Sequence, residues 1–143
     1  MIIGLGTDLV GVARIAGVYA RHGEHFLART YSAAERAYCL AARDPAERLA
    51  ARWAAKEACM KALGTGWAQG VGFTDISLLA DAGGVPRLQL AGGALARAQL
   101  LGAGRWHCSV SHSDGVAIAV VVLEAAAAPG LGSGADARSM DAR

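Results

Sequence analysis

The sequence has 143 residues, which is enough for one domain with a hydrophobic core. Hydrophobic residues make up 54% of the chain and charged residues 18%, a composition that predicts a soluble globular protein. The formal net charge of +2 is too small to indicate a nucleic-acid partner, and the longest apolar run, residues 115–123, is far too short to span a bilayer.

The cysteines and the N-terminus indicate where the protein resides. Cys39, Cys59 and Cys108 show no metal-binding spacing, and their odd number suggests reduced thiols in a cytosolic protein. The N-terminus MIIGLGTD lacks a basic start and reaches an acid at Asp8, so no signal peptide is expected. We therefore predict a cytoplasmic protein without a membrane segment.

The first half of the chain is predicted to contain one strand and three helices. Alternating side chains predict a strand at residues 2–8, and VARIAGVYARH predicts a helix at residues 12–22. Ser32 and Glu35 form a capping-box pattern that begins a second helix, SAAERAYCL. The third and longest helix follows the start signal DPAE and ends at Gly64.

The second half is predicted to consist of two β-hairpins and a short helix. The segments FTDISLLA and PRLQL flank the turn DAGG, and a helix follows at about residues 94–101. The segments WHCSVSH and VAIAVVVLE flank a second turn, SDG. Helices and hairpins within one domain predict an α+β fold, with a largely antiparallel sheet packed on the long helix.

The folded domain is predicted to span residues 1–124. The remaining residues, 125–143, read AAAAPGLGSGADARSMDAR and contain almost no side chain able to build a core. Because a small, polar, Gly-rich segment cannot bury enough apolar surface to fold, we predict that this tail is disordered.

The segment RWAAKEACMKALGTG, residues 52–66, carries three charges in an otherwise apolar helix. At about 100° per residue, Lys56 falls on the apolar stripe, and Glu57 and Lys61 fall at its edge beside small alanines. Buried charges need partners. An ion pair between Glu57 and Lys61 explains two of the charges but leaves Lys56 and the small neighbours unexplained.

A metal ion and a phosphate group would fill the space beside these alanines. Mg²⁺ takes one or two carboxylates, keeps several waters and bridges phosphate oxygens. Glu57 is one candidate ligand, and Asp8, at the end of a strand with glycines at 4 and 6, is the second. A helix-capping role suits the position of Asp8 equally well. Lys56, Lys61 and the backbone N–H groups of the GTG at 64–66 could hold phosphate charge.

Four segments of the chain occur in a distinctive order and spacing: GLGTD followed by Arg14, RWAAKEACMKALGTG, GGVPRL and HCSVSH. Together they strongly resemble the holo-acyl-carrier-protein synthase family, the small 4′-phosphopantetheinyl transferases. The resemblance covers about residues 1–124. It implies transfer of the 4′-phosphopantetheine arm of coenzyme A to a serine of apo acyl carrier protein in fatty acid biosynthesis. It also implies release of adenosine 3′,5′-bisphosphate, dependence on Mg²⁺, and a homotrimer with active sites at subunit interfaces.

The resemblance assigns roles to individual residues. It places Mg²⁺ on Asp8 and Glu57, and it places Lys61 on the phosphates, where a compact ammonium suits a point charge. These three are the expected catalytic residues, and either a metal-bound water or Glu57 would take the serine proton. Lys56 would either contact phosphate or pair with a carboxylate that orients the site. Arg52 would serve the 3′-phosphate. The residues expected to bind coenzyme A are Arg52, Lys56, Lys61, Gly64, Gly66, Pro86, Ser111, His112 and Ser113.

The protein partner is expected on the first helix. Arg14, Val18 and Arg21 share one face, basic at both ends with an apolar centre, although ordinary solvated helix surfaces also carry such patterns. The family docks acidic acyl carrier proteins on this helix, and a basic face would speed encounter and set orientation.

Two other functions are compatible with parts of this pattern. One is a trimeric module that binds coenzyme A without turnover, which would not need both Asp8 and Glu57. The other is a different Mg²⁺-dependent phosphoryl-transfer enzyme with a small-molecule acceptor, which would not need the basic face of the first helix. The joint presence of Asp8 and Glu57 favours the enzyme over the binding module.

Overall fold

The computed structural model describes residues 1–66 and 68–127, so most of the predicted tail lies outside the described residues. Within these two ranges, none of the helices combines enough length with enough apolar character to cross a bilayer. In chain order the elements are β1 (Ile2–Gly11), α1 (Val12–Thr30), α2 (Ala33–Leu40), α3 (Ala46–Leu63), a 3₁₀ turn (Phe73–Asp75), β2 (Ile76–Ala80), β3 (Pro86–Leu90), α4 (Gly92–Leu100), β4 (Ala103–Ser113) and β5 (Val116–Ala125).

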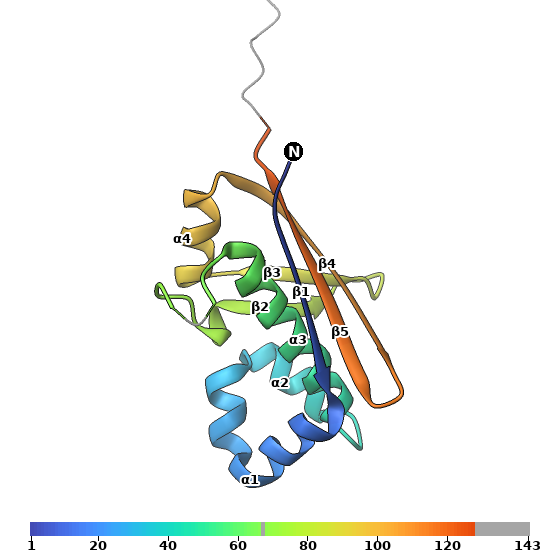
Figure 1. The fold of residues 1–143 in the computed structure, drawn as a ribbon. Coiled ribbons are helices and arrows are strands. Elements are labelled where there is room, and N and C mark those ends of the chain that lie inside the picture. Colours follow the sequence, from blue (N-terminus) through green and yellow to red (C-terminus); the bar gives the residue numbers. More distant parts are fainter. Residues whose placement is uncertain (67, 128–143) are drawn as a thin grey trace, which may run out of the picture.

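The strands form two antiparallel sheets (Figure 1). The larger sheet has the order β1-β5-β4, with Asp8 opposite Ala119 and His112 opposite Ala117. The smaller sheet is the hairpin of β2 and β3. Every strand pairing among the described residues is antiparallel and helices are mixed in, so the predicted α+β class is confirmed.

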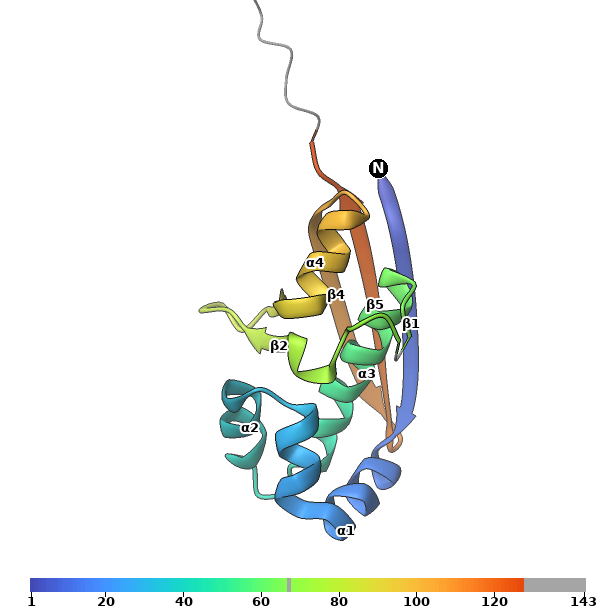
Figure 2. The same ribbon diagram turned by 90° about the vertical axis from the view of Figure 1, so that its left-hand side faces the viewer.

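The long helix α3 packs directly on the larger sheet, and Figure 2 shows α3 and α4 on the same side of its strands. A Cβ atom on Gly6 would collide with the carbonyl oxygen of Ala58, and one on Gly4 would lie 2.5 Å from that of Ala62. Only glycine therefore lets β1 and α3 approach so closely. The two strand glycines serve helix packing rather than ligand approach.

Capping groups define both ends of α3. Asp44 Oδ1 accepts a hydrogen bond of 3.0 Å from the Ala46 N–H at the start of the helix. At its end Gly64 takes the left-handed conformation, with φ 69°. The helix is buried on most of its circumference. Its fully buried apolar side chains are Leu49, Ala50, Ala54, Ala55, Ala58, Cys59, Met60 and Leu63.

Several predicted boundaries differ from the structure, three of them with a clear physical reason. The strand β1 continues to Gly11 because it pairs with β5 along its whole length. The helix α1 continues beyond residue 22, with a kink at Gly23 (φ 49°, ψ −130°) that lets its second half bury Phe26. Residues 73–75 form a 3₁₀ turn instead of the first part of a strand.

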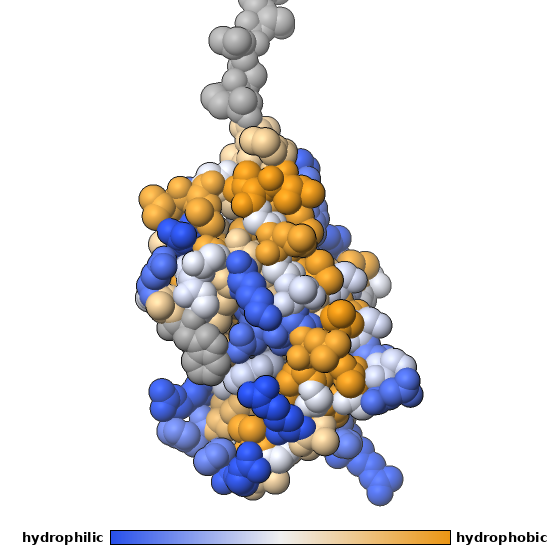
Figure 3. Space-filling view, viewed as in Figure 1, coloured by the Kyte–Doolittle hydropathy of each residue, from blue (hydrophilic) through white to orange (hydrophobic). Residues whose placement is uncertain are grey.

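The larger sheet leaves its other face open. Its exposed apolar side chains, which we call the outer sheet face, are Leu5, Leu9, Ile118 and Val120. Figure 3 shows apolar groups at the surface along the course of β1 and β5. An exposed apolar patch on a sheet is typical of a protein–protein contact.

Candidate active site

Asp8 and Lys61 join β1 to the end of α3. The Lys61 ammonium donates hydrogen bonds to Asp8 Oδ1 at 3.0 Å and to the Thr7 carbonyl oxygen at 2.9 Å. The Asp8 side chain is 16% exposed and that of Lys61 is 53% exposed, so the pair is open to solvent on the lysine side. A ligand can therefore reach the Lys61 ammonium and the adjacent carboxylate.

Glu57 lies on the same edge of the molecule as this pair. The helix runs opposite to β1, because Gly4 lies beside Ala62 and Gly6 beside Ala58. Asp8 lies two residues beyond Gly6 on the strand. It is therefore level with the helical turn that precedes Ala58, residues 54–57. Glu57 is half-buried and shares a side of α3 with Lys61, four positions later. The structure thus pairs Asp8 with Lys61 and has Glu57 one helical turn before Lys61 on α3.

The donor set at this edge fits magnesium better than a transition metal. Among residues 1–66 and 68–127 there is no group of three or more His, Cys, Asp or Glu side chains that could hold a metal ion. Mg²⁺ is commonly bound through one or two carboxylates plus substrate phosphates. Asp8 and Glu57 supply the carboxylates, and Asp8 Oδ1 already faces a cation in the Lys61 ammonium.

Lys56 is not part of an anion site, so its assignment to coenzyme A is wrong. Its side chain is fully buried, and its ammonium donates to Glu35 Oε2 at 2.7 Å, to the Phe73 carbonyl oxygen at 3.0 Å and to the Ile76 carbonyl oxygen. These three bonds use all the donors of the ammonium group. Burial lowers the pKa of Lys56, and the neighbouring carboxylate of Glu35 acts in the opposite direction.

Glu35 is the partner that the sequence analysis missed. It forms the expected capping box, because the Ser32 N–H donates to Glu35 Oε2 at 2.9 Å and the Glu35 N–H donates to Ser32 Oγ at 3.3 Å. Its second oxygen, Oε1, accepts from the Leu78 N–H at 2.8 Å. The buried pair of Glu35 and Lys56 therefore ties together α2, α3 and β2.

A second group of predicted residues meets in a separate cleft of about 150 Å³. Arg52, Pro86 and His112 all line it, and His112 Nδ1 lies 3.2 Å from Glu47 Oε2. Arg52 is only 7% exposed, and its Nη1 donates to the Arg48 carbonyl oxygen at 3.2 Å. Its Nε is buried without a hydrogen-bond partner in the described part of the chain.

The two groups face opposite sides of α3. Lys61 follows Arg52 by nine positions, which at about 100° per residue puts the two side chains about 180° apart. One chain therefore cannot present Arg52 and Lys61 to the same small ligand.

The other residues predicted to bind coenzyme A lie in two different places. Gly64 and Gly66, with φ 69° and 53°, form the left-handed exit from α3, close to Lys61. Ser111 and Ser113 are exposed, and strand alternation directs them to the face of β4 opposite His112. The structure does not bring these serines into the cleft of one chain, and Ser113 Oγ donates instead to Asp114 Oδ2 at 3.3 Å.

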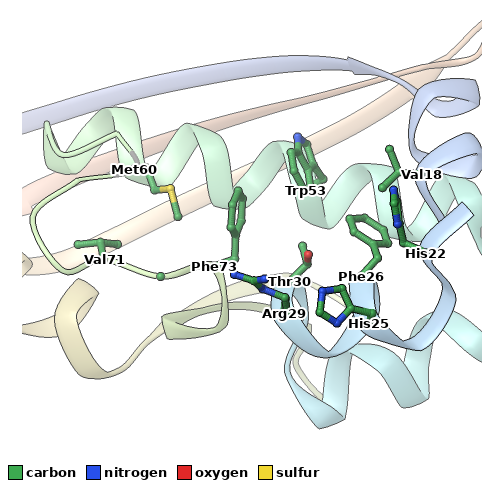
Figure 4. A pocket seen from close by; sticks show the side chains of 11 residues that line it. Val18, His22, His25, Phe26, Arg29, Thr30, Trp53, Met60, Val71 and Phe73 are labelled. Carbon is green, nitrogen blue, oxygen red and sulfur yellow. The ribbon is translucent and has the colours of Figure 1, made fainter.

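A larger pocket of about 600 Å³ lies between α1 and α3 (Figure 4). Trp53 stacks on Phe73, with ring centroids 4.8 Å apart and an interplanar angle of 25°. Glu57 follows Trp53 by four positions and precedes Met60 by three, so the candidate metal ligand is on the side of α3 that carries these two pocket residues. The lining residues are Val18, His22, His25, Phe26, Arg29, Thr30, Trp53, Met60, Val71, Gly72 and Phe73.

The predicted partner-binding face lies beside the same pocket. Arg14 and Arg21 are exposed on α1, and Val18 between them is half-buried and contributes to the pocket wall. The pocket itself was not predicted, because it is assembled from α1, α3 and the 71–73 segment.

The sequence model of the 4′-phosphopantetheinyl transferase superfamily matches residues 4–121 of the chain. The protein belongs to this superfamily. A holo-[acyl-carrier-protein] synthase of Solidesulfovibrio magneticus is 54% identical to this transferase over 124 residues, which cover 87% of this chain and 99% of the relative. One from Alkalilimnicola ehrlichii is 51% identical over 125 residues, which cover 87% and 98%.

Solved structures of the transferase superfamily have the same fold. The holo-[acyl-carrier-protein] synthase of Neisseria meningitidis is similar with a TM-score of 0.78 at 37% identity, covering 87% of this chain and 99% of that one. That of Helicobacter pylori, solved in complex with coenzyme A, is similar with a TM-score of 0.74 at 32% identity, covering 84% and 99%. These likenesses confirm the family resemblance carried by the four sequence motifs.

Proposed function

We propose that this protein transfers the 4′-phosphopantetheine arm of coenzyme A to a serine of apo acyl carrier protein, with Mg²⁺, as a step that serves fatty acid biosynthesis. One observation carries the proposal: the Lys61 ammonium pairs with Asp8, while Trp53 and Met60 of the same helix α3 line an apolar pocket between α1 and α3. Glu57 lies between these residues along α3. Such a site offers charge for a diphosphate and an apolar space beside it for the arm.

The reaction is a substitution at a phosphorus atom, in which one P–O bond forms and another breaks. The serine oxygen forms a bond to the phosphorus that carries the pantetheine arm, and the bond from that phosphorus to the bridging oxygen breaks. Adenosine 3′,5′-bisphosphate leaves, and the serine proton passes to a base, for which the Glu57 carboxylate is the candidate in this chain.

Neutralising and orienting charge is the main task of the protein in this step. Asp8 and Glu57 would hold Mg²⁺, which when bound supplies positive charge to the phosphate oxygens. The Lys61 ammonium adds a second cation beside the same oxygens. Its bond to the Thr7 carbonyl oxygen holds it at the strand end, ready for the substrate.

A homotrimer with shared sites would unite the two groups of residues. Arg52 and His112 face away from Lys61 within one chain, so a neighbouring chain would have to bring its cleft against the Asp8 edge. The outer sheet face supplies apolar surface for such an assembly. Closed cyclic assemblies repeat one such contact between all neighbours.

The acyl carrier protein would dock on α1. Arg14 and Arg21 are exposed there, and Val18 continues into the wall of the pocket. A carrier on this face would lie close to Glu57, where its serine has to meet the phosphorus.

Mass spectrometry of the carrier tests the proposed function directly. Apo acyl carrier protein is mixed with the protein, coenzyme A and Mg²⁺, and a parallel sample contains a chelator. A gain of one phosphopantetheine that requires Mg²⁺ is the expected result. Coenzyme A binding without any mass gain, over a range of pH and metal ions, would instead identify a binding module without turnover.

A further inference from the structure

The four histidines of the chain have two kinds of surroundings. Ring nitrogens of His107 and His112 lie 2.9 Å and 3.2 Å from glutamate oxygens, so each of these rings has a carboxylate partner. His22 and His25 are exposed on α1, and neither has an ion-pair or hydrogen-bond partner among the residues that the structure describes. The two histidines of α1 are therefore available to pair with a group outside the chain.

His22 and His25 belong to the wall of the large pocket between α1 and α3. Figure 4 shows both rings on the α1 side of this pocket. The kink at Gly23, with φ 49°, separates them along the helix, and both still line the same space. One rim of an apolar pocket therefore carries two side chains that can gain a positive charge.

The titratable side chains of the pocket wall are all cations or can become cations. Within the described part of the chain they are His22, His25 and Arg29, and no acid contributes to this wall. Glu24, the acid nearest to them along α1, is paired with Arg36 of α2, with Oε2 and Nη1 3.2 Å apart. The charge on this rim therefore suits an acidic partner.

Other charged groups surround the pocket on its four sides. Arg21 is exposed on α1 and adds a cation. The helix α3 contributes Glu57, which the proposed function assigns to Mg²⁺, and Lys56, which is buried in an ion pair. The segment 71–73 has no titratable side chain, and Asp75 beyond it accepts a hydrogen bond of 3.0 Å from the backbone of that segment. The α1 side of the pocket is therefore increasingly positive as the histidines gain protons.

Protonation of a histidine and binding of a carboxylate favour each other. Histidine is the side chain whose charge ordinarily changes between about pH 5 and 8. The aspartates and glutamates of an acidic protein remain ionised over that range, and a carboxylate beside an imidazole stabilises its protonated form. By linkage, protons that are taken up on binding also tighten the binding.

We propose that His22 and His25 are recognition residues that link docking of the carrier to protonation: each takes up a proton from solvent when an acidic carrier binds, so the carrier binds more tightly as the pH falls. This inference rests on the proposed function, in which an acidic acyl carrier protein docks on α1. It extends the docking face of Arg14, Val18 and Arg21 past the kink of the helix to the pocket rim.

The test measures binding of fluorescently labelled apo acyl carrier protein by anisotropy at about pH 6 and pH 8, at one ionic strength and without coenzyme A. The wild type should bind about fivefold more tightly at the lower pH, the scale of two exposed ion pairs. His22→Gln combined with His25→Gln should bind at both pH values as the wild type does at pH 8. His22→Arg combined with His25→Arg should bind at both as tightly as the wild type does at pH 6.

His107→Gln is the matched control, because it removes an exposed histidine on β4 that already has a carboxylate partner. It should keep the pH dependence of the wild type. Equal carrier affinity of the wild type at both pH values would overturn the inference, and so would an unchanged pH dependence in the double glutamine variant. Loss of coenzyme A binding in that variant, measured by calorimetry, would also overturn it, because the histidines would then belong to the donor site.

The transfer assay by mass spectrometry separates this inference from the proposed function. Mass gain by the carrier together with pH-independent binding would keep the proposed function and remove the proton linkage. Proton-linked binding without mass gain would support the role of the two histidines although no transfer occurs. A carrier that binds at neither pH and gains no mass would overturn both.

Discussion

Glu35 Oε2 lies 2.7 Å from Lys56 Nζ inside the core, where both side chains are fully buried. Removing two charges from water carries a large desolvation cost, which only good geometry and further hydrogen bonds offset. Here the Phe73 and Ile76 carbonyl oxygens accept from the ammonium, and the Leu78 N–H donates to the carboxylate. The pair therefore fixes the segment after α3, including the ring that stacks on Trp53 in the large pocket.

Lys56→Met should destabilise the protein by about 3–5 kcal/mol, because it leaves the Glu35 carboxylate buried without its cation. Urea unfolding at constant protein concentration measures this loss. Lys61→Met, which removes a lysine from a solvent-exposed pair, should cost at most about 1 kcal/mol. Equal stabilities for the two variants would mean that the core pair contributes no more than a surface pair. Adding Glu35→Gln to Lys56→Met should recover only part of the loss, because the amide removes the uncompensated charge but cannot accept from both the Ser32 N–H and the Leu78 N–H.

Unfolding free energy should fall at alkaline pH, in part through Cys59. Burial raises the pKa of this thiol from 9.0 to about 12. Between these values the unfolded chain releases the proton while the folded chain keeps it, so stability decreases as pH rises through this window. One such thiol changes the unfolding free energy by about 1.4 kcal/mol per pH unit.

Cys59→Ala should therefore show a shallower pH dependence than the wild type in urea unfolding at pH 8 to 11 under reducing conditions. The comparison isolates this thiol, because the other groups that titrate in the same range are present in both proteins. Parallel curves for the two proteins would rule out the contribution of Cys59.

Asp8→Asn and Glu57→Gln should each lower phosphopantetheine transfer by at least about a hundredfold, the scale of losing a group that stabilises transition-state charge. Both substitutions keep the shape of the side chain and remove the charge that Mg²⁺ needs. Circular dichroism and the oligomeric state should stay as in the wild type. Asp81→Asn, at the exposed β2–β3 hairpin, is the control. Near-normal Mg²⁺-dependent activity in either site variant would remove that residue from the metal site.

Mixed trimers should recover activity from two inactive parents. Glu57→Gln and His112→Ala each damage one half of the proposed shared site, so some sites in a mixed assembly contain both intact halves. The two chains are co-expressed with different tags, and mixed assemblies are purified before the transfer assay. Verified mixed trimers without activity would indicate that both residues act within one chain.

Arg14→Glu combined with Arg21→Glu should raise the KM for the acyl carrier protein and leave coenzyme A binding nearly unchanged. The reversed charges repel an acidic partner, a penalty that can reach several kcal/mol. Because exposed charges are screened over about 8 Å at physiological salt, the defect should shrink as ionic strength rises. Arg87→Glu, on the β2–β3 hairpin, serves as control. Loss of coenzyme A binding with an unchanged carrier KM would move the docking face elsewhere.

The sequence by itself determined the elements whose signals are local. The capping box of Ser32 and Glu35, the stop at Gly64 and the turns of the two hairpins all depend on hydrogen bonds and backbone conformations within a few residues. The four family motifs also depend on short stretches, which is why the superfamily could be inferred before any coordinates. The charges at 56, 57 and 61 indicated α3 as the candidate functional helix for the same reason.

Only the tertiary structure excluded Lys56 from the candidate site. Lys56 pairs with Glu35, which lies 21 positions earlier in the chain. No local sequence pattern distinguishes a buried lysine of this kind from a lysine that binds phosphate. From the sequence, the glycines of β1 could have allowed close approach by either a helix or a ligand. In the structure the space beside Gly4 and Gly6 is occupied by α3. Burial and partner choice depend on which surfaces meet, and that is set by contacts between residues distant in the chain.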